Sequence, residues 1–248
     1  MEISLAPETI AYLGSFPITN TFFITIIISL LIIITSFLLQ RKINLIPKGF
    51  QNILEWILEN LLELIDGVTK NREQTRKFFP VVATIFIFVI LSNWIEIVPG
   101  LGTIGLKHFQ EGKEGIIPFI RSNSADLNMT LALSLVVVIL VQFIGITALG
   151  VKKYTGKFLV SPLKKPYFVG TFVGALEIIS EFAKIISFSF RLFGNIFAGE
   201  VLLTVALTLV PYFLPLPFLL LEIFVGFIQA LVFAMLALVF MKIATEHH

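Results

Sequence analysis

The chain has 248 residues, of which 57% are hydrophobic and 14% are charged, a balance that excludes an ordinary soluble domain and favours a membrane protein. It contains no cysteine, which excludes disulfides, thiolate metal sites and a cysteine nucleophile. The formal net charge of +2 comes from Lys and Arg residues dispersed over connecting segments, so the sequence argues against a nucleic-acid-binding face.

The first apolar segment has no charged residue from Thr9 to Gln40, and its core, residues 22–39, is rich in Ile and Leu. About 20 apolar residues are enough to cross a bilayer, so we predict the first membrane span here. No basic segment precedes this run and no small-residue cleavage site follows it. The sequence therefore argues against a removable signal peptide.

Residues 51–68 have apolar side chains at helical spacing opposite a row of acidic ones, which predicts an amphipathic helix. Two interpretations stay open: the helix lies on the membrane surface, or it packs on another subunit. The apolar stripe consists of Ile53, Leu54, Ile57, Leu58, Leu61, Leu62 and Ile65, and the acidic face of Glu55, Glu59, Glu63 and Asp66.

A second span is predicted at residues 78–98, after a charged link at residues 70–77. Pro99 and Gly100 end this span, and the glycine-rich segment beyond them is expected to be a loop. Glu96 lies near the outer end of the span, where it either serves an ion entrance or is an interfacial charge.

A charge-free run at residues 127–151 predicts the third span. Ser124 or Asp126 is placed to cap its first turn, and for Asp126 a role at an outer entrance is the alternative. A basic connector follows, which contains Lys152, Lys153, Lys157, Lys164 and Lys165.

The next apolar stretch, residues 168–210, is too long for one perpendicular span. About 43 residues of helix measure about 60 Å, roughly twice the hydrocarbon thickness of about 30 Å. We expect this helix to tilt steeply, break or project beyond the membrane. A proline-rich turn separates it from a last apolar segment at residues 218–241, which carries Glu222 and Gln229.

The basic residues predict the orientation. With the N-terminus outside, thirteen of the 18 Lys and Arg residues fall in inner connectors and three in outer loops, as the positive-inside rule requires. The other two, Lys184 and Arg191, lie within apolar sequence.

The chain is expected to form one membrane domain with four parts. These are residues 1–46 with span one, 47–69 with the surface helix, 78–151 with a two-helix hairpin and outer loop, and 166–246 with two long channel-forming helices.

The long fourth segment carries one polar stripe. Ionisable side chains at membrane depth cost at least about 2.5–3.5 kcal/mol each, so they mark ion pathways or paired contacts. Glu181 and Lys184 are expected to neutralise each other at i and i+3. Arg191 has no acid close to it on the stripe, and its guanidinium stays protonated, so we expect a partner from another helix or subunit. The stripe consists of Glu177, Glu181, Lys184, Ser187, Arg191 and Asn195.

Two further polar positions follow from helical periodicity. Glu200 lies nine residues beyond Arg191, about 900° of rotation, and so faces the opposite side of the same helix. In the last segment Glu222, Gly226 and Gln229 share one face, where the glycine leaves room for close approach or water.

The sequence RLFGN at Arg191–Asn195, continuing through Ala198–Gly199–Glu200, resembles the signature of subunit a of F-type ATP synthases. Supporting motifs stand in the same order: SADLNMT at 124–130, LE at 176–177, Lys184, and QA at 229–230. The resemblance covers almost the whole chain.

This resemblance implies an all-α integral membrane protein with about five membrane helices and one amphipathic surface helix, whose last two long helices lie strongly tilted around a ring of c subunits. It implies that Arg191 is the essential charge facing the ring. It also places Glu200, Glu222, Gln229 and Asn195 along two aqueous half-channels, with Ser187, Asp126, Glu96 and Glu177 as further candidates for the proton path. In much of the family one of the positions of Glu200 and Glu222 is histidine, and here both are glutamate, which leaves the proton relay between them open.

The implied partners are the c ring, the peripheral stalk subunit b and the rest of the complex, in a bacterial inner membrane rather than an organelle. Protons are the default coupling ion, with Na⁺ the alternative. No Walker loop is present, so nucleotide binding is expected in other subunits, and no cofactor or metal is expected. The resemblance implies an ion-translocating subunit of a larger ATP synthase, and whether this subunit is itself an enzyme is left open.

Two other classes compete with this interpretation. A secondary transporter would show an internal repeat, which the sequence lacks. A passive structural membrane subunit gives no reason for an arginine without an intrahelical partner.

Overall fold

The computed structural model describes residues 7–41, 43–98, 100, 104–110, 113–158, 169–211 and 213–246. Its described residues are mainly helical, and five helices are long and apolar enough to cross a membrane. This confirms the predicted all-α membrane fold. The five helices are α1 (Asn20–Arg41), α3 (Arg72–Trp94), α4 (Leu127–Leu149), α6 (Val169–Leu209) and α7 (Pro215–Thr245).

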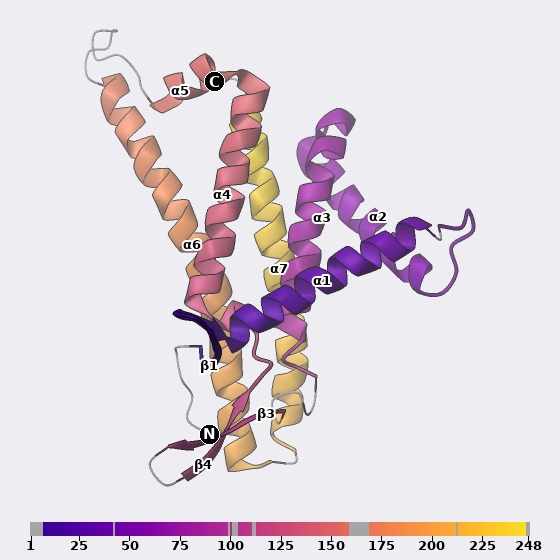
Figure 1. The fold of residues 1–248 in the computed structure, drawn as a ribbon. Helices are drawn as coiled ribbons and strands as arrows, with labels where there is room; N and C mark the ends of the chain where they lie inside the picture. Colours follow the sequence, from indigo (N-terminus) through magenta and orange to yellow (C-terminus); the bar gives the residue numbers. More distant parts are fainter. Residues whose placement is uncertain are drawn as a thin grey trace.

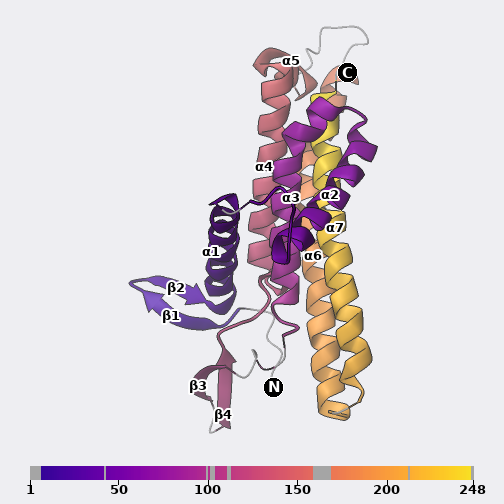
Figure 2. The same ribbon diagram turned by 90° about the vertical axis from the view of Figure 1, so that its right-hand side faces the viewer.

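Helix α7 is the centre of the bundle, because it packs against α3, α4 and α6 (Figure 1). Small side chains on its buried face let the neighbouring helices approach closely, as is common between membrane helices. The hairpin of β3 (Gly105–Gln110) and β4 (Lys113–Pro118) lies at one end of the bundle, the hairpin of β1 (Thr9–Leu13) and β2 (Phe16–Thr19) lies beside the bundle, and the C-terminal end of α7 lies at the other end (Figures 1 and 2). The buried face of α7 includes Ala230, Ala234, Ala237, Leu238 and Met241.

Helix α1 crosses the other helices at a steep angle (Figure 1). Its contacts are with α3, with the preceding strand and with the short 3₁₀ helix η2 (Asn123–Ala125). The Thr21 hydroxyl donates to Asp126 Oδ2 at 2.8 Å, which ties the start of α1 to the start of α4.

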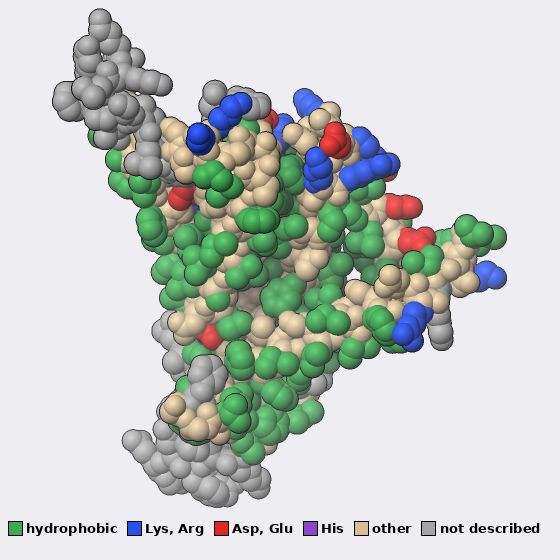
Figure 3. Space-filling model, turned by 45° about the horizontal axis from the view of Figure 1, so that its top comes forward, with side chains coloured by type: hydrophobic (Ala, Val, Ile, Leu, Met, Phe, Trp, Pro, Cys, Tyr) green, Lys and Arg blue, Asp and Glu red, His purple; other side chains and the backbone are tan. Residues whose placement is uncertain are grey.

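Large apolar side chains cover much of the outside of the bundle (Figure 3). On α6, for example, Phe182 is 65% exposed. A soluble protein rarely exposes such continuous apolar surface, whereas a lipid-facing surface has this character. The Lys and Arg side chains visible in Figure 3 lie mostly toward the end that carries α5 (Val151–Phe158) and the first turn of α3.

Helix α2 (Phe50–Thr69) is the predicted amphipathic helix, and two of the seven residues of its apolar stripe are buried within the chain. Leu61 and Ile65 belong to the main core, and the Lys242 ammonium donates to Val68 O at 3.1 Å. Neither open interpretation anticipated this intramolecular packing. Nearer the start of the helix, Trp56 remains 65% exposed.

Two segments predicted to be irregular are helical. Helix α3 begins at Arg72 instead of residue 78, because the Asn71 side chain caps it by accepting from Glu73 N at 2.9 Å. The basic connector contains α5 (Val151–Phe158), which follows Gly150 at φ +79°, a conformation that favours glycine. Lys164 and Lys165 lie outside the described residues.

Two hairpins also depart from the sequence predictions. The expected glycine-rich loop contains β3 (Gly105–Gln110) paired antiparallel with β4 (Lys113–Pro118). The first apolar run contains β1 (Thr9–Leu13) and β2 (Phe16–Thr19) before α1 begins. A short loop lets each pair of strands satisfy backbone hydrogen bonds locally.

Candidate ion-translocation site

Helix α6 is one unbroken helix of 41 residues, about 60 Å long, which exceeds the membrane core as predicted. One flank of α6 faces α4 and η2, since the Ser189 and Thr130 hydroxyls lie 2.9 Å apart. Glu200 lies eleven residues beyond Ser189, about three full turns, and therefore falls on this flank. Ser187 and Arg191 fall on the opposite flank.

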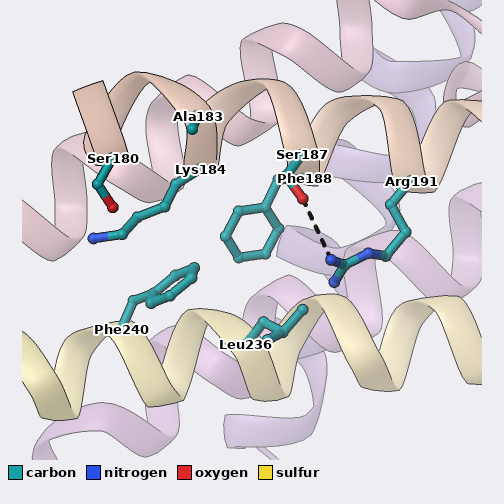
Figure 4. Close-up of a pocket in the computed structure, with 8 residues that line it drawn as sticks. All are labelled: Ser180, Ala183, Lys184, Ser187, Phe188, Arg191, Leu236 and Phe240. Carbon is teal, nitrogen blue, oxygen red and sulfur yellow. Dashed lines mark hydrogen bonds between the residues drawn. The ribbon is translucent and has the colours of Figure 1, made fainter. Parts of the chain in front are cut away.

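Arg191 is exposed on its flank of α6. Its Nη2 donates to Ser187 Oγ at 3.4 Å, a long contact (Figure 4). Within the part of the chain that the structure describes, no carboxylate forms an ion pair with this guanidinium. The side chain borders an open pocket of about 230 Å³ between α6 and α7, lined also by Leu236 and Phe240.

Lys184 lies on the same pocket but has its charge matched. Its ammonium is 2.6 Å from Glu181 Oε1, as the i and i+3 spacing predicts, and lies 4.9 Å from the centre of the Phe240 ring. The two cations that the sequence places within apolar segments therefore differ: Lys184 forms an ion pair with an acid of its own helix, and Arg191 forms none with the described residues.

On the other flank Glu200 forms an ion pair with Arg121. Arg121 Nε lies 3.0 Å from Glu200 Oε1, and Arg121 Nη2 donates to Oε2 at 3.1 Å. Arg121 is only 7% exposed. The basic residue count treats Arg121 as an outer-loop charge, whereas the structure buries it against α6.

Glu222 of α7 lies beside this pair and is 7% exposed. A Cβ atom at Gly199 would lie 3.2 Å from Glu222 Oε1, so the glycine lets the carboxyl group approach the backbone of α6. Oε2 of Glu222 is buried and has no hydrogen-bond partner among the described residues.

Glu96 completes the group just past the end of α3. Its Oε2 accepts a hydrogen bond from Ser122 N at 3.3 Å. Burial, and then the charges of Glu200 and Glu222, raise the pKa of Glu96 to about 8, although Arg121 and the Ser122 hydrogen bond oppose this. We call Glu96, Arg121, Glu200 and Glu222 the acid cluster, which contains three carboxyl groups and one guanidinium.

The structure gives Asp126 the capping position. Its Oδ1 accepts from Asn128 N at 2.9 Å, and its Oδ2 accepts from the Thr21 hydroxyl. Both oxygens are thus engaged in holding α4 and α1.

The remaining candidates lie on the expected helices. Asn195 is exposed, one turn beyond Arg191, and Glu177 is half-buried near the start of α6. Gln229 is half-buried on α7, two turns beyond Glu222. The room predicted at Gly226 is filled by α3, because Asn93 Nδ2 donates to Gly226 O at 2.9 Å.

Sequence reasoning missed Arg121 and Tyr154. The Tyr154 phenol of α5 is buried and donates to the Gln142 side-chain carbonyl of α4. Burial, helped by Glu181 and Glu177, raises the pKa of Tyr154 to about 12. The only sequence signal for Arg121 was its place five residues before Asp126, next to the SADLNMT motif.

Comparison with known sequences decides the family. The ATP synthase A chain family matches residues 21–242. A protein named ATP synthase subunit a from Campylobacter jejuni is 35% identical over 219 residues, which cover 88% of this chain and 87% of that protein. Another of that name, from Moorella thermoacetica, is 33% identical over 242 residues and 98% of each chain.

This chain belongs to the ATP synthase A chain family. The match spans all five apolar helices, so the chain is a multi-pass membrane member of that family. The family match also includes Arg191 and the whole acid cluster.

Proposed function

We propose that this chain is subunit a of the membrane sector of a rotary ATP synthase, and that it carries protons to and from carboxyl groups on a ring of c subunits. Family membership supports the subunit. The observation that carries the mechanism is Arg191, a permanent cation exposed on a membrane helix with no acid of the described chain beside it. Such a charge needs an anionic partner, which a ring carboxylate supplies.

The two flanks of α6 then serve different steps. On the acid cluster flank, Glu200, Glu222 and Gln229 line the route between the outer side and the ring. On the opposite flank, Ser187, Asn195 and Glu177 line the route to the inner side. A ring carboxyl that is protonated can turn through lipid, because a neutral acid is far less costly there than a carboxylate.

Arg191 separates the two routes electrostatically. A protonated ring carboxyl that approaches the guanidinium loses its proton, because the fixed positive charge favours the carboxylate. Protons therefore cannot pass directly from one route to the other, and each must accompany nearly a full rotation of the ring. Direction follows from the proton gradient.

The energy released by one proton is too small to make one ATP. One charge crossing 100 mV releases about 2.3 kcal/mol, so several protons are combined for each ATP. Nucleotide chemistry belongs to other subunits of the complex, and subunit b holds this chain against the rotating ring. The proposed location is a bacterial inner membrane. A secondary transporter or a passive structural subunit would give Arg191 no ring carboxylate to meet.

The deciding experiment replaces Arg191 with alanine in assembled complexes. ATP-driven proton pumping should fall by about 10²-fold or more, the scale of losing a preorganised charge, while assembly continues. Arg76→Ala is the matched control, because Arg76 is an exposed arginine near the start of α3. Wild-type pumping by Arg191→Ala complexes would exclude the proposal.

A further inference from the structure

The acid cluster contains more acids than its one guanidinium can neutralise. With all groups ionised, its net charge would be −2, buried between α6, α7 and the end of α3. Charge at this density is not maintained inside a protein without counter-ions, so the carboxyl groups must divide into a permanent anion and groups that hold protons.

Geometry distinguishes Glu200 from the other two acids. Arg121 Nη2 donates to Glu200 Oε2 at 3.1 Å, and Arg121 Nε lies 3.0 Å from Oε1, so the guanidinium and the carboxylate form a close, charge-assisted pair. Arg121 is itself held in place by its neighbour, since the Ser122 hydroxyl donates to Ser92 O of α3 at 3.1 Å. The ion pair is therefore fixed at both partners.

Glu222 has the opposite character. It lies against Gly199, one residue from Glu200 along α6, but its Oε2 has no hydrogen-bond partner among the described residues. An unsatisfied buried oxygen is costly unless it binds a proton or a water molecule. Glu222 is thus the carboxyl group of the cluster with an oxygen available for exchange.

We infer that Arg121 is a positioning residue that fixes Glu200 as the permanent anion of the cluster, so that Glu222 is the carboxyl group that exchanges the transferred proton. The inference rests on the proposed function. In one step Glu222 Oε2 takes a proton from hydronium, which leaves as water; in the next the acid gives that proton to a ring carboxylate and returns to its anionic form. Glu200 changes neither its protonation nor its partner.

The test is a double-mutant cycle on the whole complex, with Arg121→Gln, Glu200→Gln and both together. Arg121→Gln leaves Glu200 buried without its cation, and pumping should fall by about 10-fold or more, the cost of misplacing a working group. Adding Glu200→Gln removes that stranded charge. The double variant should therefore recover to the level of Glu200→Gln alone.

Two further measurements separate positioning from simple structural support. Infrared spectra should show one additional protonated carboxyl group in Arg121→Gln complexes and none in the double variant. Arg121→Lys keeps the charge and should retain more pumping than Arg121→Gln. Arg72→Gln is the matched control, because Arg72 also pairs with an acid, Asp66, but at an exposed site, and it should pump normally.

Glu222→Gln should lose more pumping than Glu200→Gln in equal amounts of assembled complex. The inference is overturned if Glu200→Gln is the more damaging of the two, or if the Arg121 and Glu200 effects simply multiply. The proposed function has its own test, because it fails only if Arg191→Ala complexes pump normally. If Arg191→Ala abolishes pumping but the effects of Arg121→Gln and Glu200→Gln multiply, the proposed function stands and only this inference is rejected.

Discussion

Arg191 and Arg121 lie on opposite flanks of the same helix and show two ways to hold a guanidinium in a membrane protein. Arg121 is buried and paired with both oxygens of Glu200. Arg191 is exposed, and its contact in the described chain is the Ser187 hydroxyl. A cation that is matched inside its own chain is a structural element, whereas an unmatched one indicates a partner outside the chain.

Lys184 makes the comparison sharper, because it lies on the same pocket as Arg191, two turns away (Figure 4). Both cations lie on the same helix, yet Lys184 has Glu181 at 2.6 Å. The presence of charge within apolar sequence therefore does not identify the working residue. In the proposed mechanism, Arg191 is distinguished by having no counter-ion among the described residues.

The largest effect is expected when Arg191 is given the kind of partner that Arg121 has. Ser187→Glu places a carboxylate one turn before Arg191, where it can form an i, i+4 ion pair. The ring carboxylate would then compete with a permanent internal anion, and ATP-driven pumping should fall by about 10²-fold. The fall would be measured as the rate of ATP-driven proton uptake into inverted membrane vesicles.

Ser187→Gln is the control for that substitution, since it has the same size without the charge. It should retain clearly more pumping than Ser187→Glu, because it adds no anion beside Arg191. If the glutamate variant pumped as well as the glutamine variant, an unmatched charge at Arg191 would not be what drives proton release.

The two flanks of α6 should also differ in how an added methyl group affects pumping, and this effect is smaller. A Cβ at Gly199 would meet Glu222 Oε1 at 3.2 Å, whereas a Cβ at Gly194 meets no described atom of this chain within 4 Å. Gly199→Ala should displace the Glu222 carboxyl by a few tenths of an ångström and slow pumping about 3-fold to 10-fold, because proton transfer depends steeply on distance.

Gly194→Ala is the matched substitution on the same helix, and it should leave the thermal stability of the complex unchanged or slightly higher. Pumping rates and melting temperatures of both variants would be compared in one preparation. Equal loss of pumping in the two variants with unchanged stability would contradict a special role for the contact between Gly199 and Glu222.

Helical periodicity explains which parts of this site were predictable. The stripe through Arg191, the pairing of Lys184 with Glu181 and the opposite placement of Glu200 follow from spacing within one helix, which is local information. The five spans follow from run length and composition. These predictions needed no knowledge of how the helices pack.

What the sequence did not predict depends on contacts between distant segments. Arg121 and Glu200 are 79 residues apart, and Asn93 and Gly226 are 133 apart. Nothing in the spacing of either pair indicates that they meet. The burial of Leu61 and Ile65 in α2 has the same cause, because an amphipathic stripe specifies that a surface is covered and not what covers it.

The smallest effect concerns the pH response of the acid cluster. The pKa of Glu96 is raised to about 8 by burial and by Glu200 and Glu222, with Arg121 opposing, so the folded state binds a proton that the unfolded chain releases above about pH 4.5. The folded state is therefore favoured at low pH, and this contribution is lost as pH rises toward 8. Wild-type complexes should melt at progressively lower temperature from pH 6 to pH 8, and the melting temperature should change little above pH 8.

Glu96→Gln removes the titrating group and should flatten the slope of melting temperature against pH, while Glu59→Gln on the exposed face of α2 should not. An unchanged slope in Glu96→Gln would mean that the cluster shares its excess charge in some way other than through this carboxyl, and it would leave Glu222 to account for the whole pH response.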